Sequence, residues 1–309
     1  MHYILFLAYN MTMKNRKKLL SILLTTIAVG SLGAAGILWV QGTLADQQAD
    51  AVWENLRTTA QSAVPSTAPE PTSTPAAASP SPAPQPTATP APTPEPEPTP
   101  DPAVVNPYKD SYLANSDMAA WLQIPDTVID YPVMWTPEDE TFYLYRDFEG
   151  NQNKNGCLLL DTDSSLEPLT TNLIIHGHNM RSGAMFGKLT DYEAEDFYHT
   201  HKQIILYTPE CQRNYEVIAV FRSQVFRKSD DVFKFYKFFQ ANTQEEFDDF
   251  YQNIKEMSLY DTGVTAQFGD HFLTLSTCVY HVEQGRFVVV AKEVESGEHY
   301  LPLEDTEEQ

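Results

Sequence analysis

The segment His271-Phe-Leu-Thr-Leu-Ser-Thr-Cys278 ends in a cysteine, and eight residues later Arg286-Phe-Val-Val-Val-Ala291 begins with an arginine. Both runs are rich in β-branched and aromatic residues, which predicts two buried strands. The seven residues between them, Val279 to Gly285, suit the loop of a hairpin. We therefore expect the cysteine at the end of one strand to lie beside the arginine at the start of its neighbour. That arrangement fits a thiolate nucleophile with a cationic partner.

A cysteine nucleophile usually needs a histidine, which can be distant in sequence. His178 is the best candidate, because it ends the short apolar run Leu173-Ile-Ile-His-Gly-His178, 100 residues before Cys278. His176 in the same run is expected to be a structural or pocket-wall residue. A metal site that combines His176 and His178 with His199 and His201 is the alternative. No spaced carboxylate or cysteine cluster completes such a site, so no metal and no cofactor are predicted.

Short apolar runs separated by turn residues predict a mainly β domain, either a closed barrel or a sandwich. Besides the two strands above, the runs are Trp121–Ile124, Val128–Val133, Gly156–Leu160, Asn172–Ile175, Gln203–Tyr207 and Tyr215–Phe221. Two helices are also expected. Ser111–Trp121 has cap residues before an apolar face. Thr243–Met257 begins with a capping box of Thr243 and Glu246 and continues with apolar residues at i, i+3, i+4 and i+7.

Three motifs together resemble the sortase family, and class B within it. They are Thr274-Leu-Ser-Thr-Cys278, the Gly177-His178-Asn179 turn after a strand, and Gly285-Arg286-Phe-Val-Val-Val. The resemblance extends from about Tyr112 to Val294. It implies a closed β-barrel of about eight strands, with an N-terminal helix and a long helix inserted before the cysteine strand.

The resemblance also implies a cysteine transpeptidase, a thiol-dependent member of the peptidase class. Cys278 would form a thioacyl enzyme with a surface protein that carries a C-terminal sorting signal, and His178 would move the protons. Arg286 would stabilise the oxyanion or hold the substrate backbone. The acceptor would be an amine of the peptidoglycan cross-bridge or of lipid II. By their positions in class B, Ser276 and Leu144 are predicted to line the peptide groove, with a role in the core as the alternative. Thr277 is also predicted to contact the substrate.

Residues 1–40 carry four basic residues and no acidic ones, whereas residues 41–309 carry 16 basic and 42 acidic residues, a net charge of −26. So acidic a surface repels nucleic acid, which we exclude as a partner. The 22 residues from Leu19 to Val40 contain no charge and follow a basic cluster, which predicts a membrane anchor with its N-terminus in the cytoplasm. A signal peptide cleaved near Leu44-Ala45 is the alternative.

Sixteen of the 22 prolines fall between Pro65 and Pro107, a composition that cannot build a core. The predicted organisation is therefore a cytoplasmic N-terminus (1–18), a transmembrane anchor (19–40), an extracellular stalk helix (41–64), a disordered Pro/Thr/Ala-rich linker (65–107), an extracellular catalytic domain (108–296) and an acidic tail (297–309).

The chain has three cysteines, an odd number that leaves at least one thiol free in an exported protein. Cys157, in Gly-Cys-Leu-Leu-Leu, is expected in the core, and Cys211, in a turn-like segment, is expected to be exposed. No disulfide bond is expected between them. The alternative is a Cys157–Cys211 bond with Cys278 as an ordinary buried thiol.

Two further functions stay open on the sequence. One is a sortase that assembles pili by joining subunits through a lysine. The other is a surface binding module without catalytic activity, carried on a stalk.

Overall fold

The computed structural model describes residues 104–280 and 282–303, and upstream of them residues 21, 24–27, 47 and 51–58. Residues 51–58 are helical, within the predicted stalk helix. Most of the predicted anchor, the linker up to residue 103 and the tail beyond residue 303 lie outside the described residues. In the part of the chain that is described, no helix combines the length and the apolar character that crossing a bilayer requires.

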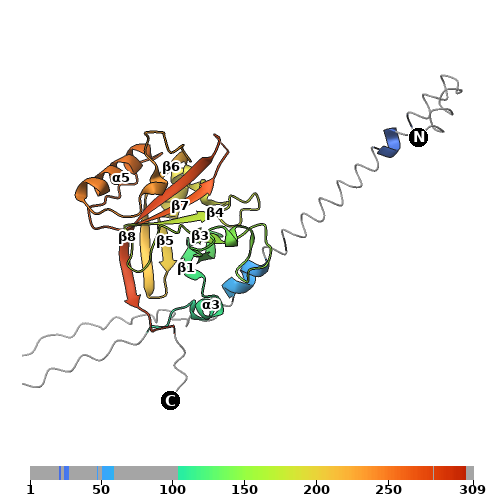
Figure 1. Ribbon diagram of the computed structural model, residues 1–309, viewed down its shortest axis with the longest axis horizontal. Helices are drawn as coiled ribbons and strands as arrows, with labels where there is room; N and C mark the ends of the chain where they lie inside the picture. The colour runs from blue at the N-terminus through green and yellow to red at the C-terminus, as the bar shows by residue number, and fades with distance from the viewer. Residues whose placement is uncertain are drawn as a thin grey trace, which may run out of the picture. The chain divides into compact units, whose positions relative to one another are not determined.

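Eight strands close into a barrel (Figure 1), which confirms the barrel rather than the sandwich. The strands are β1 Met118–Gln123, β2 Asp130–Met134, β3 Leu158–Leu160, β4 Asn172–Gly177, β5 Gln203–Tyr207, β6 Cys211–Gln224, β7 Phe272–Cys278 and β8 Gly285–His299. Their order around the barrel is β1-β2-β3-β4-β7-β8-β6-β5. The helices and 3-10 turns are α3 Lys109–Ala114, η1 Phe142–Tyr145, η2 Leu189–Glu193, α4 Glu195–Thr200, η3 Phe235–Lys237 and α5 Gln244–Met257.

The two long strands β6 and β8 pair antiparallel over most of their length, and β7 pairs antiparallel with the first half of β8. Strand β4 pairs with β7 in the parallel direction. Residues 272–277 of β7 are all buried, as expected of a strand that lies between two neighbours and is covered on both faces. The parallel pairing is what brings the ends of β4 and β7 to the same edge of the barrel.

The first predicted helix is shorter than expected. Helix α3 ends at Ala114, and the segment from Met118 to Trp121, predicted as helical, forms most of strand β1. Asn115 does not start a helix. Its side-chain amide donates to Tyr143 Oη and to the carbonyl of Phe148, so it links the end of α3 to the η1 region. The backbone hydrogen bonds of this segment are made by pairing of β1 with β2 and β5. A short apolar run is compatible with either a helix or a strand, so the pattern alone does not decide between them.

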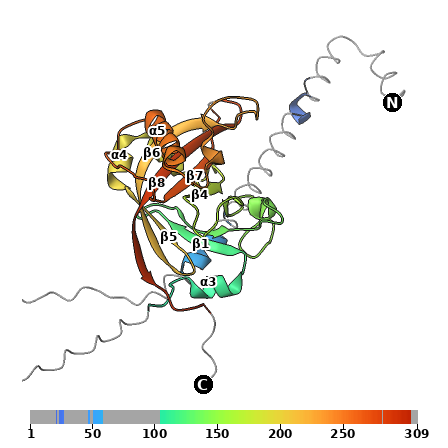
Figure 2. The same ribbon diagram turned by 60° about the vertical axis from the view of Figure 1, so that its left-hand side comes forward.

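The second predicted helix is confirmed. Helix α5 has Thr243 as its N-cap, and the capping box with Glu246 is formed on both sides. The helix lies against the barrel (Figure 2) and buries Phe247, Phe250 and Ile254. These side chains join a core cluster with Phe272 of β7 and residues of β6 and β8. The aromatic stripe therefore serves packing, and it anchors the first residue of the strand that ends at Cys278.

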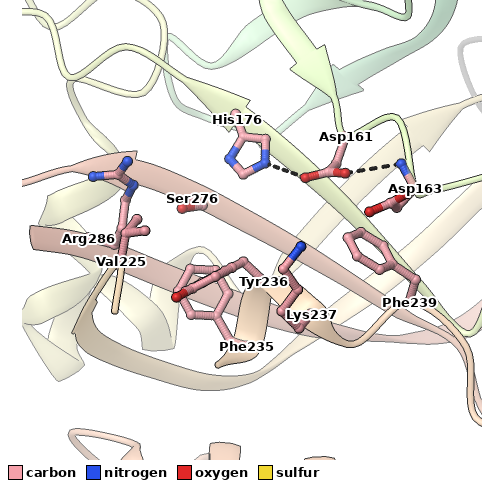
Figure 3. Close-up of a pocket in the computed structure, with 10 residues that line it drawn as sticks. All are labelled: Asp161, Asp163, His176, Val225, Phe235, Tyr236, Lys237, Phe239, Ser276 and Arg286. Carbon is pink, nitrogen blue, oxygen red and sulfur yellow. Dashed lines mark hydrogen bonds and ion pairs between the residues drawn. The ribbon is translucent and has the colours of Figure 1, made fainter. Parts of the chain in front are cut away.

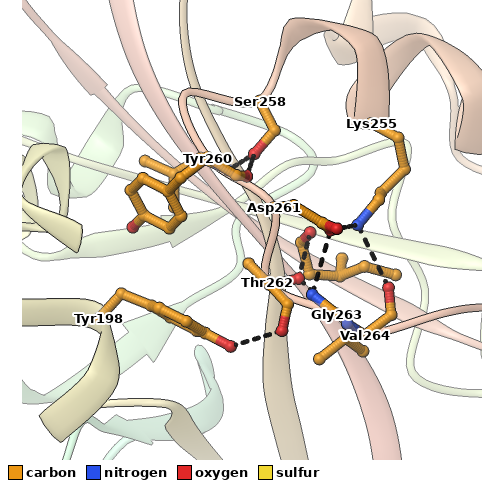
Figure 4. Close-up of polar contacts among 10 residues, drawn as sticks. Tyr198, Lys255, Ser258, Tyr260, Asp261, Thr262, Gly263 and Val264 are labelled. Carbon is orange, nitrogen blue, oxygen red and sulfur yellow. Dashed lines mark hydrogen bonds and ion pairs between the residues drawn. The ribbon is translucent and has the colours of Figure 1, made fainter. Parts of the chain in front are cut away.

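The segment between α5 and β7 is tied to the barrel by polar contacts (Figure 4). The Tyr198 hydroxyl donates to the carbonyl of Thr262 at 3.0 Å, and Thr262 Oγ1 donates to the carbonyl of Ile218 in β6 at 2.9 Å. Lys255 of α5 forms an ion pair with Asp261 at 2.9 Å. The path of the chain into β7 is thus fixed by both packing and hydrogen bonds.

The folded region extends slightly beyond its predicted limits of 108 and 296. Strand β8 continues to His299, within the predicted tail, and Val104 forms a parallel bridge with Tyr300. All three cysteines are free thiols. Cys157 is buried as expected, but the prediction that Cys211 is exposed is wrong: Cys211 is 2% exposed, because it starts strand β6 instead of lying in a turn.

Candidate active site

Three strand ends meet at one edge of the barrel, and each carries one of the predicted catalytic residues. The β4–β7 ladder ends with Gly177 opposite Thr277, so His178 and Cys278 are the next residues on two neighbouring strands. Neighbouring strands lie about 4.8 Å apart. Across the other side of β7, Cys278 is the direct partner of Arg286 at the start of β8. Residues 178, 278 and 286 are therefore brought together by register, from parts of the chain that are 100 residues apart.

Cys278 is the exposed thiol of the three cysteines. The other two are buried in the domain, and burial, aided by the charge of Asp147, raises the pKa of the Cys157 thiol far above its usual range. A thiol that stays protonated is a poor nucleophile. Accessibility therefore selects Cys278, and the alternative of an ordinary buried thiol at this position is wrong.

His178 is held by the η1 region of the chain. Its Nε2 atom lies 2.8 Å from the carbonyl oxygen of Leu144, and its ring stacks on Tyr145 with the centroids 5.3 Å apart. A carbonyl oxygen can only accept, so Nε2 carries the hydrogen of this bond. In the neutral imidazole, Nδ1 is then the atom free to accept a proton. Leu144 thus contacts the site through its main-chain carbonyl, which holds the His178 ring.

The guanidinium of Arg286 is hydrogen-bonded to the two residues that precede it in the chain. One terminal nitrogen donates to the carbonyl oxygens of Gln284 and Gly285, at 3.2 and 3.1 Å. No carboxylate lies within ion-pair distance of Arg286 among the side chains that the structure describes. A cation bonded only to neutral carbonyls keeps donors that an anionic oxygen can engage.

A small cavity of about 190 Å³ has Arg286 on one side (Figure 3), and neither Cys278 nor His178 is among the residues that line it. Ser276 lines it from β7, and its hydroxyl is buried without a hydrogen-bond partner among the described residues. Opposite, His176 Nε2 lies 3.0 Å from a carboxylate oxygen of Asp161. Burial alone would raise the pKa of Asp161, but the hydrogen bonds from His176 and from the Asp163 backbone, with the charges of His176 and Lys237, lower it. His176 is therefore a wall residue paired with a carboxylate.

Thr277 points away from this cavity. It is 1% exposed, it alternates with Ser276 and Cys278 along the strand, and its hydroxyl donates to the carbonyl of Gly177 at 2.7 Å. In this structure the Thr277 hydroxyl joins two strands of the barrel, and substrate contact by Thr277 stays a prediction.

His199 and His201, considered as partners of the two active-site histidines in a metal site, lie elsewhere. They line a second cavity of about 400 Å³ with Lys202 and Glu216. Within residues 104–280 and 282–303, no group of three or more metal-ligating side chains comes together.

Three residues near the site were not predicted from the sequence. Tyr145 stacks on His178, Asp161 pairs with His176, and Asn179 donates from its side-chain amide to the carbonyl oxygen of Cys278 at 2.8 Å. Asn179 follows His178 directly, which was the one available signal. The roles of Tyr145 and Asp161 depend on contacts across 33 and 15 residues of chain and have no local signature.

The chain is similar in sequence and in fold to proteins of a known family. A family model described as the sortase domain matches residues 122–294. Sortase B of Listeria monocytogenes is 32% identical over 186 residues, covering 60% of this chain and 72% of that protein. Sortase B of Staphylococcus aureus is 29% identical over 180 residues, covering 58% and 70%. A solved structure of a Staphylococcus aureus sortase B–substrate complex has a TM-score of 0.55 at 26% identity, covering 62% of this chain and 87% of that one.

Proposed function

Because the chain belongs to the sortase family, and to its class B, we propose that it sorts surface proteins by a transpeptidation that Cys278, His178 and Arg286 carry out. The observation that carries this assignment of roles is the strand register. It puts His178 and Cys278 on adjacent ends of β4 and β7, and it pairs Cys278 with Arg286.

In the first half of the reaction, Nδ1 of His178 takes the proton of the Cys278 thiol, and the resulting thiolate attacks the carbonyl carbon of a peptide bond in the sorting signal. A C–S bond forms, the C–N bond breaks, and the departing amine takes a proton from His178. The Leu144 carbonyl holds His178 by its Nε2–H, so Nδ1 is the atom that delivers this proton. The product is a thioacyl enzyme.

In the second half, an amine attacks the thioester carbonyl. His178 accepts the proton of the amine, a new amide bond forms, and the thiolate of Cys278 leaves. A thioester reacts readily with an amine, so a thiol nucleophile suits transfer as well as cleavage.

Arg286 supplies positive charge where the tetrahedral intermediates develop a negative oxygen. Its guanidinium cannot be deprotonated, and its present partners are two neutral carbonyls of its own loop. A charge-assisted hydrogen bond to an oxyanion is stronger than bonds to neutral carbonyls, so the exchange of partners is favourable.

The donor substrate is a surface protein with a C-terminal sorting signal, and the acceptor is an amine of the peptidoglycan cross-bridge or of lipid II. Support for the donor comes from the Staphylococcus aureus relative, whose structure is that of a substrate complex. In our proposal Ser276 and the cavity beside it contact the signal. The domain works outside the cell, tethered by a single membrane span at residues 19–40, as the charge-free segment after a basic cluster predicts.

The test incubates the purified chain with a library of signal peptides and with two acceptors, a cross-bridge amine and a lysine side-chain amine, and reads the products by mass. We expect wild-type protein to form a covalent adduct on Cys278 and an amide with the cross-bridge amine, and Cys278→Ala to form neither. Circular dichroism is the folding control. Because residue 278 is exposed, we expect Cys278→Ala and the wild type to give the same spectrum. Transfer only to lysine would instead identify a pilus-assembling enzyme. Peptide binding without any adduct on the wild type would identify a binding module and refute the proposal.

A further inference from the structure

The peptide group between Cys278 and Val279 is hydrogen-bonded on both sides. On one side, the side-chain amide of Asn179 donates to the carbonyl oxygen of Cys278 at 2.8 Å. On the other side, the N–H of Val279 donates to the carbonyl oxygen of Gly285 at 3.0 Å. Since a carbonyl can only accept, the nitrogen end of the Asn179 amide must face it. The plane of this peptide is therefore fixed from two directions.

These two bonds connect the three elements that carry the reactive side chains. Asn179 directly follows His178, and Gly285 directly precedes Arg286. The peptide itself belongs to the residue that carries the thiol. A rotation of this peptide would break a bond to the loop after β4 or a bond to the start of β8, and it would turn the Cys278 side chain relative to both neighbours.

Asn179 extends the contact between β4 and β7 beyond the end of their ladder. The backbone pairing of these strands stops at Gly177 and Thr277. There, the Thr277 hydroxyl donates from β7 to the β4 carbonyl of Gly177 at 2.7 Å. One residue further, Asn179 donates in the opposite direction, from the loop after β4 to β7. The two bonds thus run in opposite directions between the strands, and the second one ends on the main chain of Cys278 itself.

We propose that Asn179 is a positioning residue that sets the orientation of Cys278 between His178 and Arg286. The inference rests on the proposed function for its catalytic consequence, but the geometry that it invokes can be measured without a substrate. Losing one hydrogen bond here lowers kcat by about tenfold, equivalent to about 1.4 kcal/mol, which is the usual worth of a single hydrogen bond. KM changes little, because Asn179 does not line the cavity beside Arg286.

Three variants of the full chain test this role. Asn179→Ala removes the donor, and Asn179→Asp keeps the shape but replaces the donor with an acceptor. Asn253→Ala is the matched control: Asn253 also donates from its side chain to a backbone carbonyl, that of Asp249 at 2.8 Å, but on helix α5. The readouts are kcat and KM for peptide transfer, the thermal midpoint, and hydrogen exchange of the Val279 amide.

We expect both Asn179 variants to lose about tenfold in kcat with KM within about twofold, and Asn253→Ala to match the wild type. Exchange of the Val279 amide should become at least tenfold faster in the Asn179 variants only. Full activity of Asn179→Asp, or a loss of kcat that follows the thermal midpoint, would overturn the inference, as would unchanged exchange at Val279. If the wild type transfers no peptide, the proposed function fails, and the exchange experiment still decides whether Asn179 holds this peptide.

Discussion

Asn172, the first residue of β4, is fully buried and makes two side-chain hydrogen bonds in the interior. Its amide nitrogen donates to the carbonyl of Phe238 at 2.9 Å, and its oxygen accepts from the Thr274 hydroxyl at 2.8 Å. Asn172→Ala leaves the buried Thr274 hydroxyl without its acceptor and the part-buried Phe238 carbonyl without its donor. Each such loss costs about 1–3 kcal/mol, so we expect the free energy of unfolding to fall by about 2–6 kcal/mol. In a domain of this size that corresponds to a drop of about 5–15 °C in the thermal midpoint.

The same substitution should also affect substrate binding. The segment held by Asn172 continues into the wall of the cavity beside Arg286, which Phe235, Lys237 and Phe239 help to form. Loosening that wall should raise KM for the signal peptide more than it lowers kcat. The assay is thermal unfolding together with peptide-transfer kinetics.

Thr274→Val serves as the matched variant, because it removes one bond of Asn172 and leaves the bond to Phe238 in place. We expect it to cost about 1–3 kcal/mol and to leave KM unchanged. If Asn172→Ala shifts the midpoint by less than about 2 °C, or if both variants raise KM equally, the role assigned to this buried amide is incorrect.

Two further predictions concern stability. Phe250→Ala in helix α5 should lower the free energy of unfolding, measured in urea, by about 3–5 kcal/mol. The reason is that Phe250 is buried against Phe238 and Phe272, with ring centroids 4.0 and 5.3 Å away. A loss below about 1 kcal/mol would contradict this packing. The lowered pKa of Asp161 predicts that its pairing with His176 stabilises the fold fully above the ordinary value of 3.8, and that this contribution is lost as the pH falls through the lower folded-state pKa. Asp161→Asn should therefore weaken the acid dependence of the thermal midpoint in that range, and identical pH curves for variant and wild type would argue against the pairing.

The parts of the fold that could be predicted are those where a local pattern and the tertiary environment agree. The capping box at Thr243 identified the start of α5, and the β-branched run before Cys278 identified β7. The run Met118–Trp121 shows the limit. It is short and apolar, and only its pairing with two other strands, the nearby β2 and the sequence-distant β5, decides that it is extended. Cys211 was misplaced for a similar reason, since its turn-like neighbours gave no sign of the fourteen-residue strand that starts there.

The predicted catalytic residues could be selected because each ends or begins a recognisable strand. Their mutual position depends on a parallel pairing between β4 and β7 that no local pattern contains. The contacts that orient them are even less visible in the sequence. Tyr145 stacks on His178 from a 3-10 turn, and Leu144 contributes a main-chain carbonyl, which any residue would provide. A motif shows that residues are adjacent but not which face of the strand each one occupies, so the burial of Thr277 was not predictable from it.

Strand β8 has a consequence for when the protein can become active. It is the last strand of the barrel, it pairs with both β6 and β7, and it brings Arg286 to the thiol. During synthesis, β7 has no partner on one side until β8 has emerged, and the pairing of β8 with β6 joins segments that are distant in sequence, which form contacts slowly. A nascent chain that already displays Cys278 therefore has a thiol but no assembled active site, and reactivity appears only once the final strand has been inserted.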